Sequence, residues 1–433
     1  MYSFMNKVTI SGIKNLKNEV TLDFYKTNMG RNIKLNKNNI KAIYGANGAG
    51  KSAIVHAFDI YEELVSKSGQ LFSESFKQKL DELINQQTNV FTIKINFVIY
   101  NERNLIEGEY IHELVIARTQ NDFLIHSETL SQVKSRNERV IIKVEKGEIK
   151  VNRLTNELKD AFFNQLRQRS VVDLYGDMVV DNKDIDDEDQ DKLTPFLMFA
   201  NDLYVETVDA DNHFSFVSRV HHTKNEETWS KYIAEFYKWL KQSRQEPLSE
   251  YTYSISEDQK NEFQKYINNL TRFLKIFKPN LVKIDISHER QNGNRINIEP
   301  YFVYNDAKIH IEFESAGIKK LTKLYQLFCY KEAGKIIIID EFDANLNDVY
   351  LIKLLQYFNE SSIGQIIFIT HNVSPMAVLA KNKNAIDFTT QDGKVTSWTK
   401  SGNYSPINIY QKGYISGLPF NIYETDFEDI FNN

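Results

Sequence analysis

The stretch Gly45-Ala46-Asn47-Gly48-Ala49-Gly50-Lys51-Ser52 lies between a predicted strand over 39–44 and a segment over 52–65 whose apolar residues recur at helical spacing. Its pattern, G-x-x-x-x-G-K-[ST] between a strand and a helix, predicts a loop that wraps phosphate groups with backbone N–H donors. We expect Lys51 to reach the β- and γ-phosphates of a nucleotide and the Ser52 hydroxyl to bind Mg²⁺. The residues predicted to hold the nucleotide here are Gly45, Asn47, Gly48, Ala49, Gly50, Lys51 and Ser52.

A second apolar run, Ile336-Ile337-Ile338-Ile339, ends in two carboxylates, Asp340 and Glu341. Continuous β-branched runs are typical of central parallel strands that are covered on both faces. We expect this strand to lie beside the strand of the phosphate loop, where Asp340 would help to hold Mg²⁺. Glu341 would then polarise the attacking water as a general base.

Two further motifs point to the same site. Glu314-Ser315-Ala316-Gly317 is a turn of small residues before a helical pattern, and a helix N-terminus can receive a phosphate. His371 ends another buried-type strand over 365–370, which places an imidazole at the edge of the sheet where phosphates are expected. We therefore predict that Ser315 and Gly317 bind the nucleotide and that Lys51, Glu341 and His371 are catalytic.

This ordered set of motifs resembles the ABC-type ATPase superfamily, with Ser315-Ala316-Gly317 similar to the signature motif, Asp343-Ala344-Asn345-Leu346 to the D-loop and His371 to the switch histidine. The resemblance implies an α/β ATPase head that uses ATP and Mg²⁺ and hydrolyses ATP to ADP and phosphate. It also implies that the signature of one protomer completes the ATP site of a second one. A homodimer or higher homo-oligomer, formed through an ATP sandwich, is therefore expected.

Within the superfamily, the motif residues are most similar to those of the soluble OLD-like and SMC-like ATPases of bacterial defence systems. The similarity covers roughly residues 1–110 and 295–420, and three departures stand out. Asn347 replaces a His that often follows the D-loop, and the Q-loop glutamine is not assigned between Gln86 and Gln87. Roughly 60 residues follow His371, too few for the nuclease domain that completes OLD enzymes.

Composition and charge exclude several classes of protein. The 433 residues are 42% hydrophobic and 26% charged, which is ordinary for a globular chain, and no apolar run has the ~18 residues of a membrane span. The N-terminus lacks a secretory signal and the single Cys329 cannot form an internal disulfide, so we expect a cytoplasmic protein without a membrane partner. With a net charge of −5, the protein as a whole has no positive electrostatic potential that would attract nucleic acid. Acidic residues also lower the net positive charge of the basic stretch over 134–150.

The chain is expected to fold as an α/β head interrupted by a largely helical insertion. We assign 1–110 to the first part of the head, 111–294 to an insertion with mixed β structure followed by a helical arm, and 295–433 to the second part. The segment 181–191 is strongly acidic and is expected to be a loop, and a helix is expected to begin at Ser256 and to end before Pro279. We expect the helices over 225–277 to project from the head.

The preferred function is an ATP-dependent sensor or scaffold in prokaryotic antiviral defence, as in the PARIS and Septu systems that the motifs resemble. It would control a separate toxin or nuclease, because no effector motif is visible in this chain. The alternative is an SMC-like ATPase in DNA repair or chromosome handling, which leaves nucleic acid open as a partner. The two short helices do not supply the long coiled coil of that class.

Overall fold

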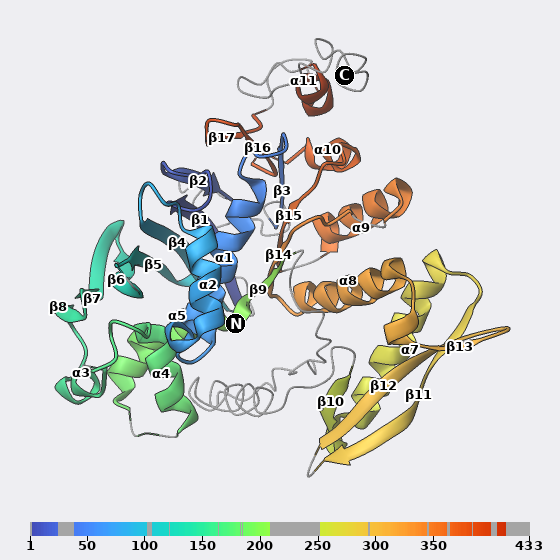
Figure 1. Cartoon of the computed structure of the whole chain (residues 1–433), viewed down its shortest axis with the longest axis horizontal. Coiled ribbons are helices and arrows are strands. Elements are labelled where there is room, and N and C mark those ends of the chain that lie inside the picture. The colour runs from blue at the N-terminus through green and yellow to red at the C-terminus, as the bar shows by residue number, and fades with distance from the viewer. Residues whose placement is uncertain are drawn as a thin grey trace.

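The computed structural model describes residues 2–24, 39–101, 106–120, 122–162, 164–181, 183, 185–207, 252–292, 295–343, 346–361, 364–382, 384–399 and 405–412. Its mixed α/β character confirms the predicted fold class. Figure 1 shows the predominantly parallel sheet between an antiparallel sheet on one side and a group of C-terminal helices on the other.

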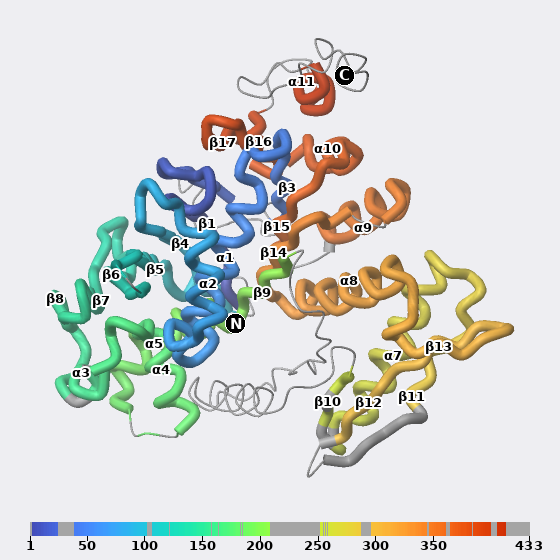
Figure 2. The backbone as a smooth tube through the Cα atoms, viewed as in Figure 1, coloured from blue at the N-terminus to red at the C-terminus, as the bar shows by residue number. Residues whose placement is uncertain are grey.

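The central sheet has the order β17-β16-β3-β15-β14-β9 in the described part of the chain, and all of it is parallel except the β16–β17 hairpin. Its strands are β3 (Ile40–Gly45), β9 (Leu203–Glu206), β14 (Ile336–Ile339), β15 (Gln365–Ile369), β16 (Ile386–Thr389) and β17 (Val395–Ser397). The strand of the carboxylates, β14, was expected beside β3, but β15 lies between them. Figure 2 shows β9, which the sequence pattern did not reveal, alongside β14 at the edge.

Alternate residues of the central strands face opposite layers. Ile336 and Ile338 pack in the cluster that contains α1, whereas Ile337 and Ile339 pack with the helices of the other face. Every residue of β3, β14 and β15 is buried, which explains why their side chains are apolar apart from Lys41 of β3 and Gln365 of β15. The helices of the second face are α8 (Ala316–Glu332), α9 (Asp348–Ser361), α10 (Ser374–Leu379) and α11 (Pro406–Gln411).

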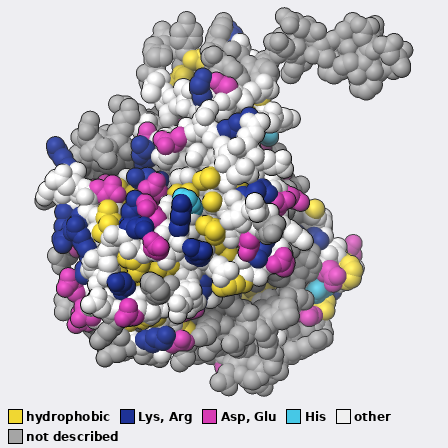
Figure 3. Space-filling view, turned by 60° about the vertical axis from the view of Figure 1, so that its left-hand side comes forward, with side chains coloured by type: hydrophobic (Ala, Val, Ile, Leu, Met, Phe, Trp, Pro, Cys, Tyr) yellow, Lys and Arg dark blue, Asp and Glu magenta, His cyan; other side chains and the backbone are white. Residues whose placement is uncertain are grey.

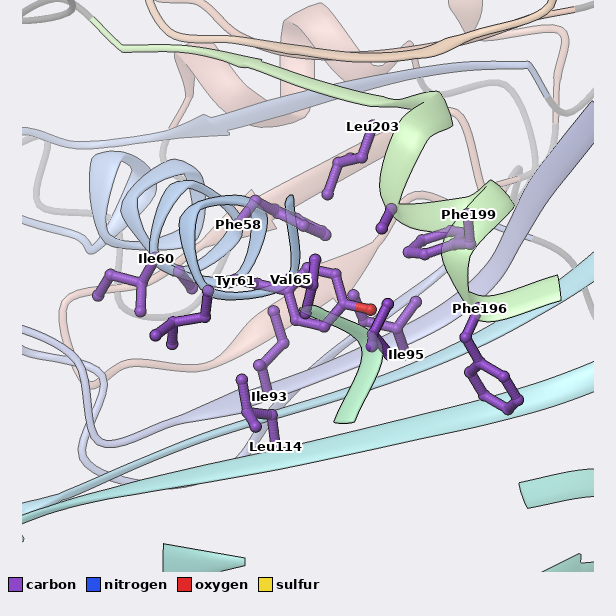
Figure 4. Packing of buried hydrophobic residues seen from close by; sticks show 14 of the residues in the cluster. Phe58, Ile60, Tyr61, Val65, Ile93, Ile95, Leu114, Phe196, Phe199 and Leu203 are labelled. Atoms are coloured by element: carbon purple, nitrogen blue, oxygen red, sulfur yellow. The ribbon is translucent and has the colours of Figure 1, made fainter. Parts of the chain in front are cut away.

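An antiparallel sheet with the order β2-β1-β4-β5-β6-β7-β8 covers α1 on its other side. Its strands are β1 (Tyr2–Ser11), β2 (Val20–Asp23), β4 (Val90–Tyr100), β5 (Ile106–Arg118), β6 (Phe123–Lys134), β7 (Asn137–Glu145) and β8 (Glu148–Asn152). Figure 4 shows Phe58 and Tyr61 of α1 packed with Ile95 of β4 and with Phe199 of α5. The helices of this layer are α1 (Lys51–Ser66), α2 (Glu74–Leu83), α3 (Asn156–Phe162), α4 (Val171–Val180) and α5 (Asp187–Asp202).

Residue 111, where the insertion was expected to begin, lies inside β5, and β5 continues the same sheet as β1 and β4. The acidic segment was predicted to be a loop, but its second half forms the start of α5. The Asp186 side chain accepts a hydrogen bond from the N–H of Glu188 and caps this helix. Carboxylates in a first helical turn are stabilised by the helix dipole, which a charge count alone does not reveal.

A third sheet, of β10 (Tyr253–Ser256), β11 (Leu281–Asn292), β12 (Arg295–Tyr304) and β13 (Lys308–His310), is covered by α7 (Lys260–Phe277). The helix therefore begins after Ser256, because Tyr253 and Ile255 pair with β12. Instead of projecting, α7 packs its apolar face in the cluster of α8, with Phe273 against Phe328. The rest of the expected arm, 225–251, lies outside the described residues.

Candidate nucleotide-binding site

A cavity of about 450 Å³ opens at the carboxyl ends of β3, β14 and β15. Open α/β sheets bind ligands at this edge. The residues that line it are Lys14, Asn15, Asn47, Gly48, Gly50, Lys51, Ser52, Ala53, Asp340, Glu341, Asp343, Ile369, Thr370 and His371. The structure thus brings together the phosphate loop, the two carboxylates and the histidine, which are far apart in the sequence.

The phosphate loop has a backbone that needs glycine at two positions of its turn. Gly48 and Gly50 have φ angles of 77° and 87°, in the left-handed region that L side chains rarely adopt. A Cβ at Gly48 would have no heavy atom within 4 Å, whereas one at Gly50 would lie 2.6 Å from Cδ2 of Leu16. Gly48 therefore faces open space, and Gly50 joins the loop tightly to the turn after β1.

Lys51 is buried, with 6% of its surface exposed, and its Nζ donates to the carbonyl oxygens of Gly45 and Ala46, each at 2.9 Å. Burial lowers the pKa of this ammonium, and the negative charge of Asp340 opposes the shift. Lys51 thus rests on two carbonyls of its own loop and faces an acidic neighbour. A phosphate in the cavity would offer the ammonium stronger, charge-assisted hydrogen bonds.

Asp340 and Glu341 follow β14 in different environments. Asp340 is buried and one of its carboxylate oxygens accepts a hydrogen bond from the N–H of Glu341 at 3.0 Å, whereas Glu341 is exposed. Glu341 has a φ of 50°, and the N–H of the next residue, Phe342, donates to the carbonyl of Ile369 on β15. Strained backbone of this kind clusters at functional sites.

His371 lies two residues after the last residue of β15 and lines the same cavity as Lys51. Partial burial and the positive charge of Lys51 lower the pKa of His371, and nearby carboxylates oppose the shift. At neutral pH the ring is therefore neutral, with one N–H donor and one acceptor nitrogen. Asn372, the next residue, donates to the carboxylate of Asp348 at 2.5 Å and so connects this loop to α9.

The signature residues lie elsewhere on the chain's surface. Ser315 caps α8 by accepting a hydrogen bond from the N–H of Ile318, and residues 315–317 are absent from the described lining of the cavity. Ser315 and Ala316 are exposed, and the nearby Phe313 has 77% of its surface exposed. The structure therefore does not bring Ser315 and Gly317 to the cavity of their own chain.

The D-loop contributes to the described lining of the cavity, whereas the candidate Q-loop does not. Asp343 lines it and Leu346 is buried, while Ala344 and Asn345 lie outside the described residues. Gln86 and Gln87 are exposed in the turn between α2 and β4. Neither glutamine belongs to the described lining.

Sequence reasoning missed two groups around the site. Asn15, in the turn after β1, donates from Nδ2 to the carbonyl of Gly48 at 2.7 Å, and its neighbour Lys14 also lines the cavity. Glu206, at the end of β9, accepts from the N–H of Asp340 through its carbonyl and pairs with Lys323 of α8 at 3.3 Å. No local sequence pattern identifies these residues, because loop packing places Asn15 and Lys14 and strand pairing places Glu206.

The donor set fits Mg²⁺ in company with a nucleotide. Ser52 and Asp340 line one cavity, and Mg²⁺ is commonly held by one or two such groups together with substrate phosphates. No group of three or more His, Cys, Asp or Glu side chains in the described segments could hold a metal ion by itself.

A larger cavity of about 800 Å³ lies between the antiparallel sheet and α5, and charges of both signs line it. None of the motif residues belongs to it, so the smaller cavity is the candidate site. The basic stretch is partly neutralised by its own acidic residues, since Lys143 lies 2.6 Å from Glu145 and Lys150 lies 2.5 Å from Glu148. Figure 3 shows cationic and anionic side chains intermingled on the face turned toward the viewer.

No protein-family model and no curated protein matches the chain. One similar solved structure is an Smc head bound to the C-winged helix domain of ScpA, with a TM-score of 0.42, 16% identity and coverage of 92% of this chain and 98% of that chain. An Smc head with an extended coiled coil, bound to the C-terminal domain of ScpA from Pyrococcus furiosus, has a TM-score of 0.41, 16% identity and coverage of 92% and 96%. The SMC head domain from Thermotoga maritima has a TM-score of 0.31, 13% identity and coverage of 92% and 99%.

All three TM-scores are below 0.5, so the functional assignment rests on the geometry of the motif residues. Within the described residues, no helix is both long and apolar enough to cross a membrane.

Proposed function

We propose that this protein binds and hydrolyses ATP in the manner of an ABC-type ATPase. The observation that carries the proposal is the convergence of Lys51, Ser52, Asp340, Glu341 and His371 on one cavity at the edge of a parallel sheet. These residues come from three separate parts of the sequence, and each has the chemistry that phosphoryl transfer to water requires.

Each side chain has a distinct role in this proposal. Lys51 binds the β- and γ-phosphates, while the loop N–H groups surround them. Glu341 orients the attacking water and accepts its proton, and His371 donates a hydrogen bond to the γ-phosphate. Ser52 and Asp340 would hold Mg²⁺, which neutralises the charge on the phosphate oxygens when it is bound.

We further propose that the active form is a homodimer or higher homo-oligomer. Ser315 and Ala316 are exposed at the N-terminus of α8, away from the cavity of their own chain, and Phe313 next to them is a large exposed apolar side chain. A second protomer that covers this surface would bury Phe313. Ser315 and Gly317 of the first protomer would then contact the phosphates of the nucleotide that the second protomer binds. The ATP would then be shared by two chains.

For the biological role, we propose a sensor or scaffold in antiviral defence that controls a separate toxin or nuclease. The support is the resemblance of the phosphate loop, the signature and the histidine motif to those of defence ATPases. An effector should therefore co-purify stoichiometrically when neighbouring genes are co-expressed. A DNA-handling ATPase should instead bind DNA with a steep dependence on salt concentration.

Two variants test the nucleotide chemistry. Lys51→Ala should lose ATP binding because the phosphates lose their fixed cation. Glu341→Gln should bind ATP and hydrolyse it roughly 10²- to 10⁴-fold more slowly, because the general base is absent. Binding is measured with a fluorescent ATP analogue and Mg²⁺, and turnover by phosphate release. Turnover near that of the wild type in both variants would contradict the proposal.

Mixing two inactive proteins tests the shared site. Lys51→Ala and Ser315→Arg protomers should recover part of the activity when mixed, since one of the two sites in a mixed dimer has neither defect. Subunit exchange is verified with differently tagged chains. If exchange occurs and no activity returns, the site is not shared between protomers.

A further inference from the structure

A buried carboxylate precedes the three residues Ser315, Ala316 and Gly317, which we call the signature turn. Glu314 has 8% of its surface exposed, whereas Ser315 and Ala316 are exposed. A buried carboxylate is costly unless its oxygens accept hydrogen bonds. Oε1 of Glu314 accepts from the hydroxyl of Tyr304 at 2.5 Å, and Oε2 accepts from the backbone N–H of Ser315 at 3.1 Å. Glu314 therefore joins the end of β12 to the first residue of the signature turn.

The donor on β12 is itself held in place. Tyr304 is the last residue of the strand, its side chain is buried, and its backbone N–H donates to the carbonyl of Ala307 at 2.7 Å. The ammonium of Lys278 lies 5.7 Å from the centroid of its ring. Burial and the charge of Glu314 raise the pKa of the Tyr304 hydroxyl, so it is protonated and donates at neutral pH.

Ser315 is held from two sides. Its N–H donates to Glu314, and its Oγ accepts from the N–H of Ile318 at 3.4 Å. A hydroxyl oxygen that accepts a hydrogen bond can still donate its own proton. The N–H groups of Ala316 and Gly317 belong to the first turn of α8 and have no acceptor within the helix. The turn thus offers three donors whose positions depend on the backbone of Ser315.

We propose that Glu314 and Tyr304 are positioning residues that hold the signature turn in the conformation in which it binds the phosphates of a second protomer's nucleotide. The inference rests on the proposed function, because it requires Ser315 and Gly317 to act at the site of the other chain. Glu314 is buried and Ser315 is exposed, so Glu314 acts through Ser315 rather than by contact with the nucleotide. Its loss should therefore impair the other protomer's site and leave the phosphate loop of its own chain intact.

Two substitutions of Glu314 in the full chain test its role as a hydrogen-bond acceptor. Glu314→Ala should lower kcat about 10- to 100-fold, because a shift of about 1 Å in a positioned group can cost that much. Glu314→Gln should retain most of the activity, since its amide oxygen can accept from the N–H of Ser315 and its NH₂ group can donate to the Tyr304 hydroxyl. Phosphate release at saturating ATP and Mg²⁺ measures kcat. Equal losses in the two variants, or full activity in Glu314→Ala, would overturn the inference.

Mixing protomers distinguishes this role from a general loss of folding. In a mixed dimer of Glu314→Ala and Lys51→Ala chains, one site combines the intact phosphate loop of the first chain with the intact signature turn of the second. Part of the activity should therefore return once differently tagged chains have exchanged. A Glu314→Ala chain that is misfolded as a whole would supply no intact site. Exchange without recovery would contradict the proposed role of Glu314.

Tyr304→Phe removes one hydrogen bond to Glu314 and keeps the ring. Its kcat should fall about threefold to tenfold, and mixing with Lys51→Ala should restore part of the loss. Tyr175→Phe is the matched control, because its hydroxyl belongs to a buried side chain and lies 3.0 Å from Oγ1 of Thr194, between α4 and α5. This control should keep the kcat of the wild type. A wild-type kcat in Tyr304→Phe would show that Tyr304 does not position the turn.

The mixture of Lys51→Ala and Ser315→Arg chains is the reference for the proposed function. If these chains exchange and recover no activity, the shared site fails and this inference fails with it. If the reference mixture recovers activity and the mixture with Glu314→Ala does not, the inference alone is wrong.

Discussion

The ammonium of Lys41 lies 2.6 Å from a carboxylate oxygen of Asp387, and the two side chains are 1% and 0% exposed. Lys41 also donates to the carbonyl of Asn384 at 2.6 Å, and the Ser397 hydroxyl donates to Asp387 at 2.6 Å. The pair joins β3, which leads into the phosphate loop, to β16, so a fully paired ionic contact lies inside the sheet that supports the site.

Lys41→Met should lower the free energy of unfolding by about 3–5 kcal/mol, because Asp387 would remain buried without its counter-ion. The double variant Lys41→Met/Asp387→Leu should lose much less than the sum of the two single changes. Urea denaturation of the four proteins measures this coupling. Additive losses would show that the two groups do not depend on each other.

The glycines of the phosphate loop should differ in their tolerance of alanine. A Cβ at Gly45 would lie 2.2 Å from Oγ1 and 2.7 Å from the carbonyl oxygen of Thr389, so Gly45→Ala should destabilise the protein by about 1–3 kcal/mol through overpacking. Gly48→Ala has open space and should cost only about 1 kcal/mol, because of its positive φ. Denaturant unfolding without nucleotide measures the loss of stability in each variant. A larger loss in Gly48→Ala than in Gly45→Ala would contradict the prediction.

Asn15→Ala should weaken ATP binding about threefold to tenfold, because the hydrogen bond from Asn15 to the Gly48 carbonyl helps to fix the top of the loop. The contact is exposed, so global stability should change by less than about 0.5 kcal/mol. Asn268→Ala, on the surface of α7, is the control and should change neither property. Titration with ATP and Mg²⁺ measures the affinity. An affinity equal to that of the wild type would show that Asn15 does not contribute to ATP binding.

Lys331 should make the stability of the protein depend on pH. Burial lowers the pKa of Lys331 to about 7, while its Nζ donates to the carbonyl of Gly364 at 2.9 Å. Between about pH 7 and pH 10 the unfolded chain holds a proton on Lys331 that the folded chain lacks, so the free energy of unfolding should rise with pH by at most about 1.4 kcal/mol per unit.

Lys331→Met should remove this rise, and Lys381→Met, at an exposed lysine, should retain it. Urea denaturation at pH 7, 8 and 9 provides the comparison. Parallel pH profiles for the wild type and Lys331→Met would show that another group is responsible.

The sequence predicts those parts of the site that are local. The glycine pattern before Lys51 and the carboxylates after Ile339 are encoded within single short segments, and the structure places both on the cavity. Glu206 and Asn15 are not predictable in this way, because strand pairing and loop packing bring them to the site. The position of β15 between β3 and β14 likewise depends on the order of strands, which a motif does not specify.

The helix α7 shows why amphipathic helices are hard to place from sequence. The spacing of Phe263, Ile267, Leu270 and Leu274 correctly predicts one buried face. The same spacing fits an arm that offers this face to a partner and a helix that packs on its own domain. The contacts of Phe273 with side chains of α8 show that α7 packs on its own domain. These contacts are non-local, so the spacing within α7 does not predict them.

The strand order of the central sheet also affects how the protein is made. β3 is complete at residue 45, yet its two partners are β15 and β16, which begin at residues 365 and 386. At typical synthesis rates of 5–20 residues per second, about 320 residues take roughly 16–64 s. During this time the nascent chain carries an apolar strand with both edges unpaired, which is a target for aggregation and for chaperones. Both edges of β3 can therefore be paired only after the last sixth of the chain, which contains β15 and β16, has been synthesised.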